Sequence, residues 1–263
     1  MTPYFQDDAV TIYHGDCMDV MRDMPDNAVD ACVTSSPYNI GSHHRENKRH
    51  NPYNDAMPEA EYQARQVLIL DEVKRLAVHC FYNHKNRIKD GVEICPRDWL
   101  RQTGWVLKQE IVWINGSPNH DPIRFYPKTE RIWWLARDAT ATLDNRHHWD
   151  VFNWSTVNKS LTGNGHTRAF PMEFPATMMD VLPSASVWLD PFAGSGTTAV
   201  AAKLLGRKCV CVEREERYCE IAAKRCAQGV LPLYAEKAVD RMANKIADAS
   251  AYGGWYCGDK EGA

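Results

Sequence analysis

The feature that most constrains the fold is a short apolar run that leads through a glycine-rich turn into an alanine-rich run, WLDPFAGSGTTAVAA, over residues 188–202. SVWLD predicts a strand that ends at Asp190, and the turn at Gly194 and Gly196 precedes a helix predicted to start near Thr197. This order lets the backbone approach a ligand closely and points helix N–H groups at it. The segment therefore predicts an α/β fold with a ligand site at a strand end.

The glycine pattern narrows the class of ligand. A phosphate-binding GxxxxGK[ST] loop needs a lysine, which does not follow Gly196, and a dinucleotide-binding GxGxxG pattern lacks its third glycine, for which Ala199 is a weak substitute. Glu213 ends the next predicted strand, 23 residues after Asp190, and a carboxylate there can accept both hydroxyls of a ribose. A nucleoside without a pyrophosphate fits, and S-adenosylmethionine is such a ligand.

Short runs rich in Val, Ile and aromatic residues alternate with helix-like stretches, which is typical of a parallel sheet covered by helices. Strands are expected over VTIYHGD (ending at Asp16), AVDACVT, AVHCFYN, QEIVWIN, RIWWLAR, SVWLD and KCVCVE. Helices are expected after Asp16 and over EAEYQARQVLILDEVKRL, RDWLRQTG, TTAVAAKLLG and EERYCEIAAKRCA. Residues 1–250 are expected to form one domain, with an irregular region at about 138–168 and a frayed tail at 251–263.

Composition excludes several classes of protein. The chain has 263 residues, of which 44% are hydrophobic and 25% charged. No apolar run approaches the ~20 residues that span a bilayer, and the N-terminus lacks a signal pattern, so a cytoplasmic protein without membrane contact is expected. Nine scattered cysteines form no CxxC pair. Buried free thiols are therefore expected, with Cys209 and Cys211 on one face of a strand, and no metal site is predicted.

A polar segment, TSSPYNIG (Thr34–Gly41), follows the apolar run AVDACVT. A tight turn explains Pro37 and Asn39, but it does not explain two hydroxyls and an aromatic ring at the end of a buried strand. The basic run HHRENKRH comes next, in a chain whose formal net charge is -3. A solvated surface is the simplest interpretation of such a run, but its position beside the polar segment favours contact with phosphate.

DPFAGSGTT and TSSPYNIG together resemble the cofactor and catalytic motifs of the DNA amino-methyltransferases that modify cytosine N4 or adenine N6, whose catalytic motif is written [DSN]PP[YFW]. The catalytic motif comes first here, as in the family's beta group. The resemblance covers most of the chain. It implies a Rossmann-like S-adenosylmethionine-dependent methyltransferase fold with a circularly permuted motif order, in which a mixed, mostly parallel sheet has helices on both faces. It also implies S-adenosyl-L-methionine as cofactor and double-stranded DNA as partner.

Three further segments carry the resemblance. IYHGDC resembles the strand whose acidic residue contacts the adenine end of the cofactor, and EIVWIN with RIWWLAR resembles the strand pair beyond the catalytic pocket. HTRAFP resembles the HPAPFP segment that packs on the methionine moiety, with departures at Thr167, Arg168 and Ala169. The implied cofactor-binding residues are Asp16, Cys17, Phe170, Pro171, Asp190, Phe192, Gly194, Ser195, Gly196, Thr197, Thr198, Glu213 and Arg214.

The resemblance assigns catalysis to Ser35, Ser36, Pro37 and Tyr38. The amino nitrogen of a base is a poor nucleophile because its lone pair is delocalised into the ring. If the Ser35 hydroxyl and the Ser36 carbonyl accept its two hydrogens, the lone pair can attack the sulfonium methyl in line. Tyr38 would stack on the base after it is flipped from the helix. Ser36 replaces the family's first proline, which loosens the turn and restores an N–H, and activity is expected to survive.

DNA contact is expected on a loop over about residues 39–58, beside the catalytic segment, and target recognition at 138–168. The expected DNA-binding residues are His43, His44, Arg45, Lys48, Arg49 and Lys85. Packing in the core, rather than stacking on bases, is expected for Trp113, Trp133, Trp134, Trp149 and Trp154.

Several alternatives stay open at this point. Serine at the first catalytic position slightly favours cytosine N4 over adenine N6. A decayed relative that binds cofactor or nucleic acid without methyl transfer is the first alternative, with Ser36 as the mark of decay. A methyltransferase for RNA or for a protein glutamine is the second, and an oxidoreductase ranks last because the glycine pattern is incomplete. A homodimer and a cognate restriction endonuclease are also left open.

Overall fold

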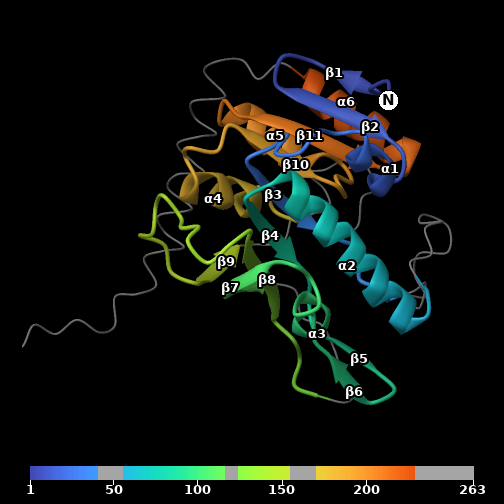
Figure 1. Ribbon diagram of the computed structural model, residues 1–263, viewed down its shortest axis with the longest axis vertical. Coiled ribbons are helices and arrows are strands. Elements are labelled where there is room, and N and C mark those ends of the chain that lie inside the picture. The colour runs from blue at the N-terminus through green and yellow to red at the C-terminus, as the bar shows by residue number, and fades with distance from the viewer. Residues whose placement is uncertain (41–55, 116–123, 155–169, 229–263) are drawn as a thin grey trace, which may run out of the picture.

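A nine-stranded mixed sheet forms the centre of the computed structural model, which describes residues 1–40, 56–115, 124–154 and 170–228 (Figure 1). Its strand order is β1-β2-β11-β10-β3-β4-β8-β7-β9. The strands are β1 (Phe5–Gln6), β2 (Val10–His14), β3 (Ala31–Ser35), β4 (His79–Asn83), β7 (Val106–Asn115), β8 (Thr129–Ala136), β9 (Val151–Trp154), β10 (Val187–Asp190) and β11 (Lys208–Glu213). The five central strands, from β2 to β4, are parallel, whereas β8 is antiparallel to both of its neighbours, so the predicted mixed, mostly parallel sheet is confirmed.

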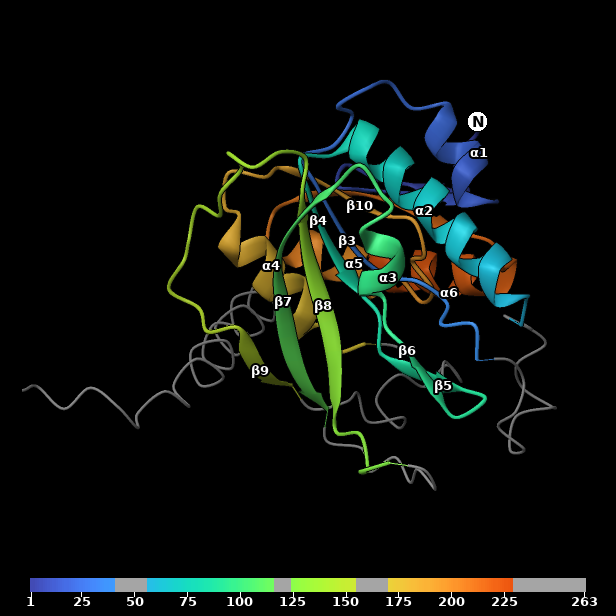
Figure 2. The same cartoon turned by 60° about the horizontal axis from the view of Figure 1, so that its bottom comes forward.

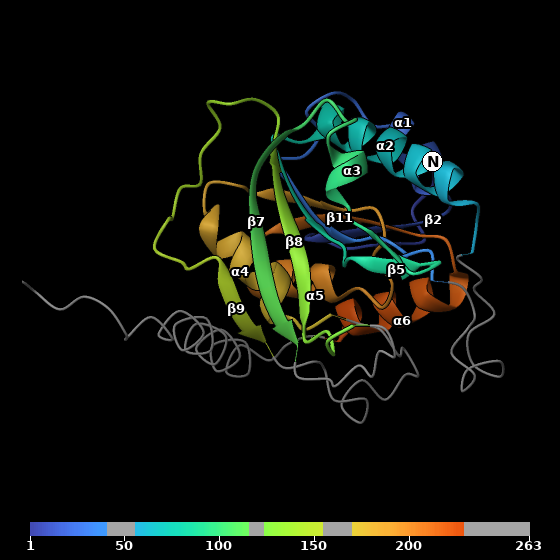
Figure 3. The same cartoon turned by 90° about the horizontal axis from the view of Figure 1, so that it is seen from below.

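Helices cover both faces of this sheet (Figure 3). One face carries α1 (Cys17–Arg22), α2 (Glu59–Leu76) and α3 (Arg97–Leu100), and the other carries α4 (Glu173–Val181), α5 (Thr197–Leu204) and α6 (Glu216–Ala227). A two-stranded hairpin of β5 (Arg87–Lys89) and β6 (Val92–Ile94) projects from the body (Figure 2). Within the described residues, no helix is long and apolar enough to cross a membrane.

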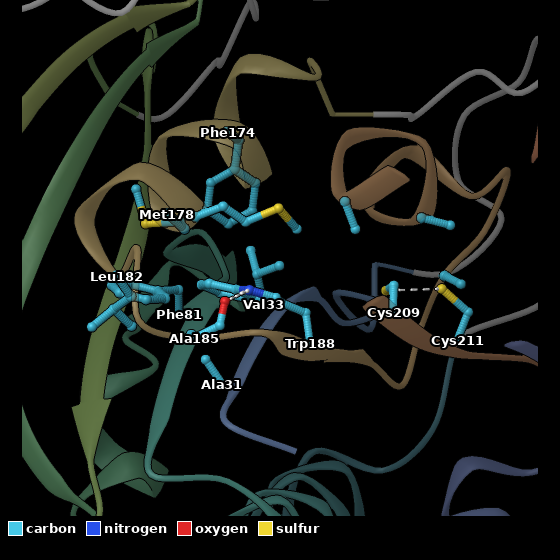
Figure 4. Packing of buried hydrophobic residues seen from close by; sticks show 14 of the residues in the cluster. Ala31, Val33, Phe81, Phe174, Met178, Leu182, Ala185, Trp188, Cys209 and Cys211 are labelled. Atoms are coloured by element: carbon cyan, nitrogen blue, oxygen red, sulfur yellow. Dashed lines mark hydrogen bonds between the residues drawn. The ribbon is translucent and has the colours of Figure 1, made fainter. Parts of the chain in front are cut away.

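The two apolar layers follow from the period of two in the central strands. In β3, Ala31 and Val33 face the cluster under α4 to α6, which also contains Phe174 and Met178 (Figure 4), while Cys32 between them faces the cluster under α1 to α3. Side chains on both faces of β3 are therefore buried against helices. This is why these strands read as continuous apolar runs in the sequence.

The chain leaves β3 and β10 in opposite directions. From β10 it runs through α5 to β11 on one side, and from β3 it runs through α2 to β4 on the other side, with α5 and α2 on opposite faces. Such a topological switch point leaves a crevice outside the carboxyl ends of the strands, where α/β proteins bind ligands. The glycine turn and the TSSPYNIG segment both begin at this point.

The helix predicted over EAEYQARQVLILDEVKRL and the strand over KCVCVE are confirmed as α2 and β11. The strand over VTIYHGD ends at His14 and not at Asp16, because the Asp16 side chain caps α1 by accepting a hydrogen bond from the Met18 N–H at 2.9 Å. The helix predicted over RDWLRQTG is wrong in its length, since α3 has only four residues.

Five elements were not predicted from the sequence: the short strands β1, β5, β6 and β9, and the helix α4. The region expected to be irregular contains β9, a four-residue strand whose alternating exposed and buried residues end in the buried Trp154. Helix α4 was missed because EFPATMMDV is apolar nearly throughout and carries Pro175, which the first turn of a helix tolerates.

The described cysteines are free thiols and most are buried, as predicted. Cys209 and Cys211 lie on one face of β11 with their sulfur atoms 3.5 Å apart (Figure 4). Of the five tryptophans expected to pack in the core, four are buried there: Trp113, Trp133, Trp134 and Trp154. The prediction is wrong for Trp149, which is 56% exposed because it precedes β9 outside the alternation that buries Phe152 and Trp154.

A glycine substitution tests the close approach of α5 to α6. Gly196 has φ +76°, and a Cβ added to it would lie 2.7 Å from the Cβ of Ala222. We expect Gly196→Ala to lower the free energy of unfolding in urea by about 2–4 kcal/mol, because steric overlap adds to backbone strain. The matched control is Gly206→Ala, at φ +66° with nothing within 4 Å of the added Cβ, which should cost about 1–2 kcal/mol. Equal losses would show that the helix contact is unimportant.

Candidate active site

The site segments that the sequence predicts lie along one edge of the sheet, at the carboxyl ends of neighbouring strands. Asp16 follows β2, Glu213 ends β11, the glycine turn follows β10 and the catalytic segment follows β3. Lys85 follows β4, the next strand along. Parallel pairing brings these segments to the same edge, although the sequence separates them widely.

The carboxylate of Asp190 joins the two principal motifs. It is fully buried and accepts hydrogen bonds from the hydroxyl of Thr34 at 2.8 Å, the hydroxyl of Thr198 at 2.6 Å and the N–H of Phe192 at 3.1 Å. Burial raises the pKa of this carboxyl, while the three donors favour its charged form. Because both carboxylate oxygens already accept hydrogen bonds from the protein, the geometry favours a positioning role for the Asp190 side chain over direct contact with a cofactor.

Glu213 shapes the glycine turn from the neighbouring strand. Its carboxylate accepts the N–H of Gly194 at one oxygen and the N–H of Glu215 at the other, both at 2.8 Å. Burial raises the pKa of the Glu213 carboxyl against the effect of these N–H groups. Each carboxylate oxygen can accept a second hydrogen bond, so the pair of ribose hydroxyls expected from the sequence fits here.

The rest of the turn is held from α6. The guanidinium of Arg225 donates to the carbonyl of Ser195 at 2.6 Å and to its hydroxyl at 3.1 Å. Gly196 takes the left-handed conformation as the first residue before α5, and the buried hydroxyls of Thr197 and Thr198 follow it. The helix start therefore presents backbone N–H groups beside a turn whose shape is set by side chains of other elements.

Asp16 has a partner that the sequence did not indicate. Arg65 of α2 donates to its second carboxylate oxygen at 2.6 Å. Burial opposes the charged form, but the Met18 N–H and the Arg65 guanidinium hold the pKa of Asp16 below its usual range. The neighbouring Cys17 is buried, which raises the pKa of its thiol to about 12.

The remaining predicted cofactor residues have defined neighbours. Phe170 packs edge-on against Phe174 with ring centroids 5.3 Å apart, and Pro171 is buried at the start of α4. Phe192 is half-buried against the apolar cluster under α1 and α2. The carbonyl of Arg214 lies 3.0 Å from the His14 ring, next to the end of β11.

The catalytic segment is organised by two polar side chains from neighbouring strands. The hydroxyl of Ser35 donates to Oδ1 of Asn83 at 2.9 Å, and the hydroxyl of Tyr38 lies 2.7 Å from the same oxygen and 3.0 Å from Oε2 of Glu130. The Asn83 amide donates to the Arg131 carbonyl at 2.9 Å, which orients its oxygen toward Ser35 and Tyr38. Asn83 ends β4 and Glu130 lies in β8, so the segment is braced by the strands beyond it.

The ring of Tyr38 packs against His84 and Lys85. Its centroid lies 4.7 Å from that of the buried His84 ring and 5.6 Å from the Nζ atom of Lys85. Burial lowers the pKa of His84 to about 3, so this imidazole is neutral at physiological pH. Burial also raises the pKa of the Tyr38 hydroxyl, which remains a neutral donor.

Ser36 and Pro37, which lie between Ser35 and Tyr38, are held by side chains from the core. The Ser36 hydroxyl lies 3.0 Å from the hydroxyl of Tyr82, and the Pro37 carbonyl accepts a hydrogen bond from Tyr62 at 2.7 Å. All four predicted catalytic residues therefore have defined partners. Of the predicted DNA-binding residues, Lys85 is described, whereas His43, His44, Arg45, Lys48 and Arg49 lie outside the described residues, as does the tail at 251–263.

Sequence reasoning missed the residues that brace the site. These are Arg65, Asn83, Asn115, Glu130 and Arg225. Asn83 and Asn115 had a usable signal, because each is a polar residue that ends a predicted strand. Arg65, Glu130 and Arg225 lie within helices or strands, and only the tertiary structure brings them to the site.

Comparison with known proteins identifies DNA methylases as similar proteins. A family model described as DNA methylase matches residues 29–224. The type II methyltransferase M.ScaI of Streptomyces caespitosus is 27% identical over 262 residues, covering 85% of this chain and 83% of its own length. The type II methyltransferase M.BglII of Bacillus subtilis is 28% identical over 250 residues, covering 80% and 67% respectively.

Solved structures share the architecture. The cytosine-N4-specific PvuII DNA methyltransferase superposes with a TM-score of 0.72 at 19% identity, over 94% of this chain and 95% of that chain. A complex of M1.HpyAVI with S-adenosylmethionine gives a TM-score of 0.57 at 20% identity, over 82% and 99%. The Rossmann-like methyltransferase fold implied by the sequence is confirmed.

Removing one hydrogen-bond donor to Asp190 tests whether its carboxylate holds the two motifs together. Thr34 is 1% exposed, and Thr34→Val replaces its hydroxyl by a methyl group of similar size. We expect a loss of about 2 kcal/mol in the free energy of unfolding, because a buried carboxylate loses a donor. Thr177→Val is the matched control, since Thr177 is fully buried and its hydroxyl has no partner among the described residues. That control should be neutral or stabilising, and equal losses would contradict the assigned role.

Proposed function

Because the chain belongs to the DNA methylase family, we propose that it transfers a methyl group from S-adenosyl-L-methionine to an exocyclic amino nitrogen of a base in double-stranded DNA, with cytosine N4 favoured over adenine N6. The observation that carries the proposal is the catalytic segment, which meets the glycine turn through Asp190 and presents the Ser35 hydroxyl at the end of β3. The serine at this position and the likeness to a cytosine-N4-specific enzyme favour cytosine.

The surroundings of the predicted cofactor residues support this proposal. Glu213 has acceptor capacity for the ribose hydroxyls, and Asp16 is assigned to the adenine end. The glycine turn and the start of α5 are assigned to the methionine part, together with Phe170 and Pro171. When bound there, the cofactor supplies an electrophilic sulfonium methyl group. The protein contributes position rather than a covalent nucleophile.

Ser35 is suited to accept a hydrogen from the base. Its own proton is directed to Asn83, which leaves the lone pairs of its oxygen for an amino hydrogen of the target. The Ser36 carbonyl is the second acceptor. With both hydrogens held, the nitrogen would become pyramidal, with its lone pair directed toward the methyl group that the bound cofactor would supply. Tyr38 stacks on the base once it has been flipped from the duplex.

A path for the released proton follows from the same contacts. The amino nitrogen loses one proton when it gains the methyl group. The Tyr38 hydroxyl lies 3.1 Å from the Ser35 oxygen and 3.0 Å from Oε2 of Glu130. If Ser35 turns its own proton from Asn83 to Tyr38 as it accepts the proton of the target, Tyr38 can pass its proton on to the Glu130 carboxylate. Asn115 donates to the other oxygen of Glu130 at 3.1 Å and fixes its orientation.

The segments assigned to DNA contact and target recognition belong to the same proposal. The loop over residues 39–58 and the region at 138–168 are assigned to DNA contact and target recognition, and Lys85, beside the Tyr38 ring, is placed near the flipped base. The family match supports DNA over RNA or a protein glutamine. A homodimer, a cognate endonuclease and a cytoplasmic location are predictions from the sequence.

Replacing the first acceptor tests the activity. Ser35→Ala should lower kcat for methyl transfer to DNA by about 100-fold, because an essential alignment is lost. Its affinity for S-adenosylmethionine, measured by calorimetry, should not change, since Ser35 lies outside the cofactor turn. The control variant is Ser186→Ala, whose exposed side chain precedes β10 at the opposite edge of the sheet and which should retain full activity.

Mass analysis of nucleosides from the treated DNA identifies the modified base. We expect N4-methylcytosine with the unmodified protein and the control variant. N6-methyladenine instead would overturn the preference for cytosine. If the protein binds S-adenosylmethionine and neither modified nucleoside forms, the proposed activity is wrong.

A further inference from the structure

Ser36 is the one position at which the catalytic segment departs from the [DSN]PP[YFW] pattern, and the structure gives its hydroxyl a specific environment. The residue is 2% exposed, so its hydroxyl faces the protein and not the crevice. A buried hydroxyl without a partner is costly, which makes its contacts informative.

The contacts form a chain of hydrogen bonds with a single direction. The Tyr82 hydroxyl donates to Oε1 of Gln66 at 2.9 Å. A tyrosine has only one hydroxyl proton, so at the 3.0 Å contact with Ser36 it is the serine that donates and the tyrosine that accepts. Ser36 thus donates into a chain that ends at the amide oxygen of Gln66.

This chain of hydrogen bonds is anchored in the buried core of the molecule. Tyr82 is 0% exposed in β4, a central strand, and Gln66 is 3% exposed in α2, the longest described helix. The next residue, Pro37, is held from the same helix through the hydroxyl of Tyr62, which donates to its carbonyl at 2.7 Å. The peptide group between Ser36 and Pro37 therefore has an anchor on each side.

We propose that Ser36 is a positioning residue for methyl transfer, and that its buried chain to Tyr82 and Gln66 holds the catalytic segment as the ring of a proline would. A proline restricts its own backbone covalently through φ. Here a hydrogen bond from the side chain restrains the residue whose carbonyl is the second acceptor for the base. The inference rests on the proposed function, and it gives Ser36 a role that a decayed enzyme would not need.

The test uses Tyr82→Phe in three backgrounds: the unmodified chain, Ser36→Ala and Ser36→Pro. In the unmodified chain, we expect Tyr82→Phe to lower kcat by about 10- to 100-fold, as for a misplaced catalytic group, with KM for S-adenosylmethionine unchanged. In the Ser36→Ala background the hydroxyl that uses Tyr82 is already gone, so the second substitution should change kcat less than 3-fold. In the Ser36→Pro background the ring replaces the hydrogen bond, and kcat should recover to within about 10-fold of the unmodified chain.

The pattern separates positioning from a general loss of stability. A purely structural role for the Tyr82 hydroxyl predicts the same fold-change in all three backgrounds, and that result would overturn the inference while leaving the proposed function intact. Should Ser36→Pro fail to fold, the comparison between the unmodified and Ser36→Ala backgrounds decides alone. If the unmodified chain binds S-adenosylmethionine but transfers no methyl group to DNA, the proposed function fails and the inference is overturned with it.

Discussion

The buried carboxylate of Asp190 is the interaction on which the arrangement of this site depends. It accepts hydrogen bonds from Thr34 at the end of β3, from Phe192 in the turn and from Thr198 in α5. Thr34 and Asp190 are 156 positions apart in the chain, yet their strands are adjacent in the sheet. A charge that burial disfavours is stabilised by donors from both motifs, so each motif holds the other in place.

From Ser35 to Tyr38, the catalytic segment is held in a similar way. Ser35 and Tyr38 are braced by polar groups of β4 and β8, and Ser36 and Pro37 are anchored through the tyrosines of β4 and α2. Methyl transfer to an amino group needs alignment of three atoms and no covalent help from the protein. A segment with a partner at every position suits that requirement, because the cost of ordering it is met during folding and not during the reaction.

Elements of the fold with a clear apolar period were predictable from the sequence. The bounds of α2 and β11 were predicted because each has a clear apolar period and sharp ends. Helix α4 is apolar nearly all round and β9 is only four residues long, so neither has a period that stands out. The same limit applies to the site: glycines and strand-end carboxylates are visible as patterns, whereas Glu130 and Arg225 are ordinary charged residues within their elements.

By itself, the sequence determined the fold class, the order of the motifs and the family, because these depend on local patterns: a strand that ends in a glycine turn, a polar segment after a buried strand, and their order along the chain. Only the tertiary structure decided which side chains serve those motifs. It turned the Asp190 carboxylate toward the protein, and it paired Asp16 with Arg65 and Ser36 with Tyr82. These pairings join strands and helices that are distant in sequence. A hydrogen bond between such elements produces no periodic pattern of residues from which it could be predicted.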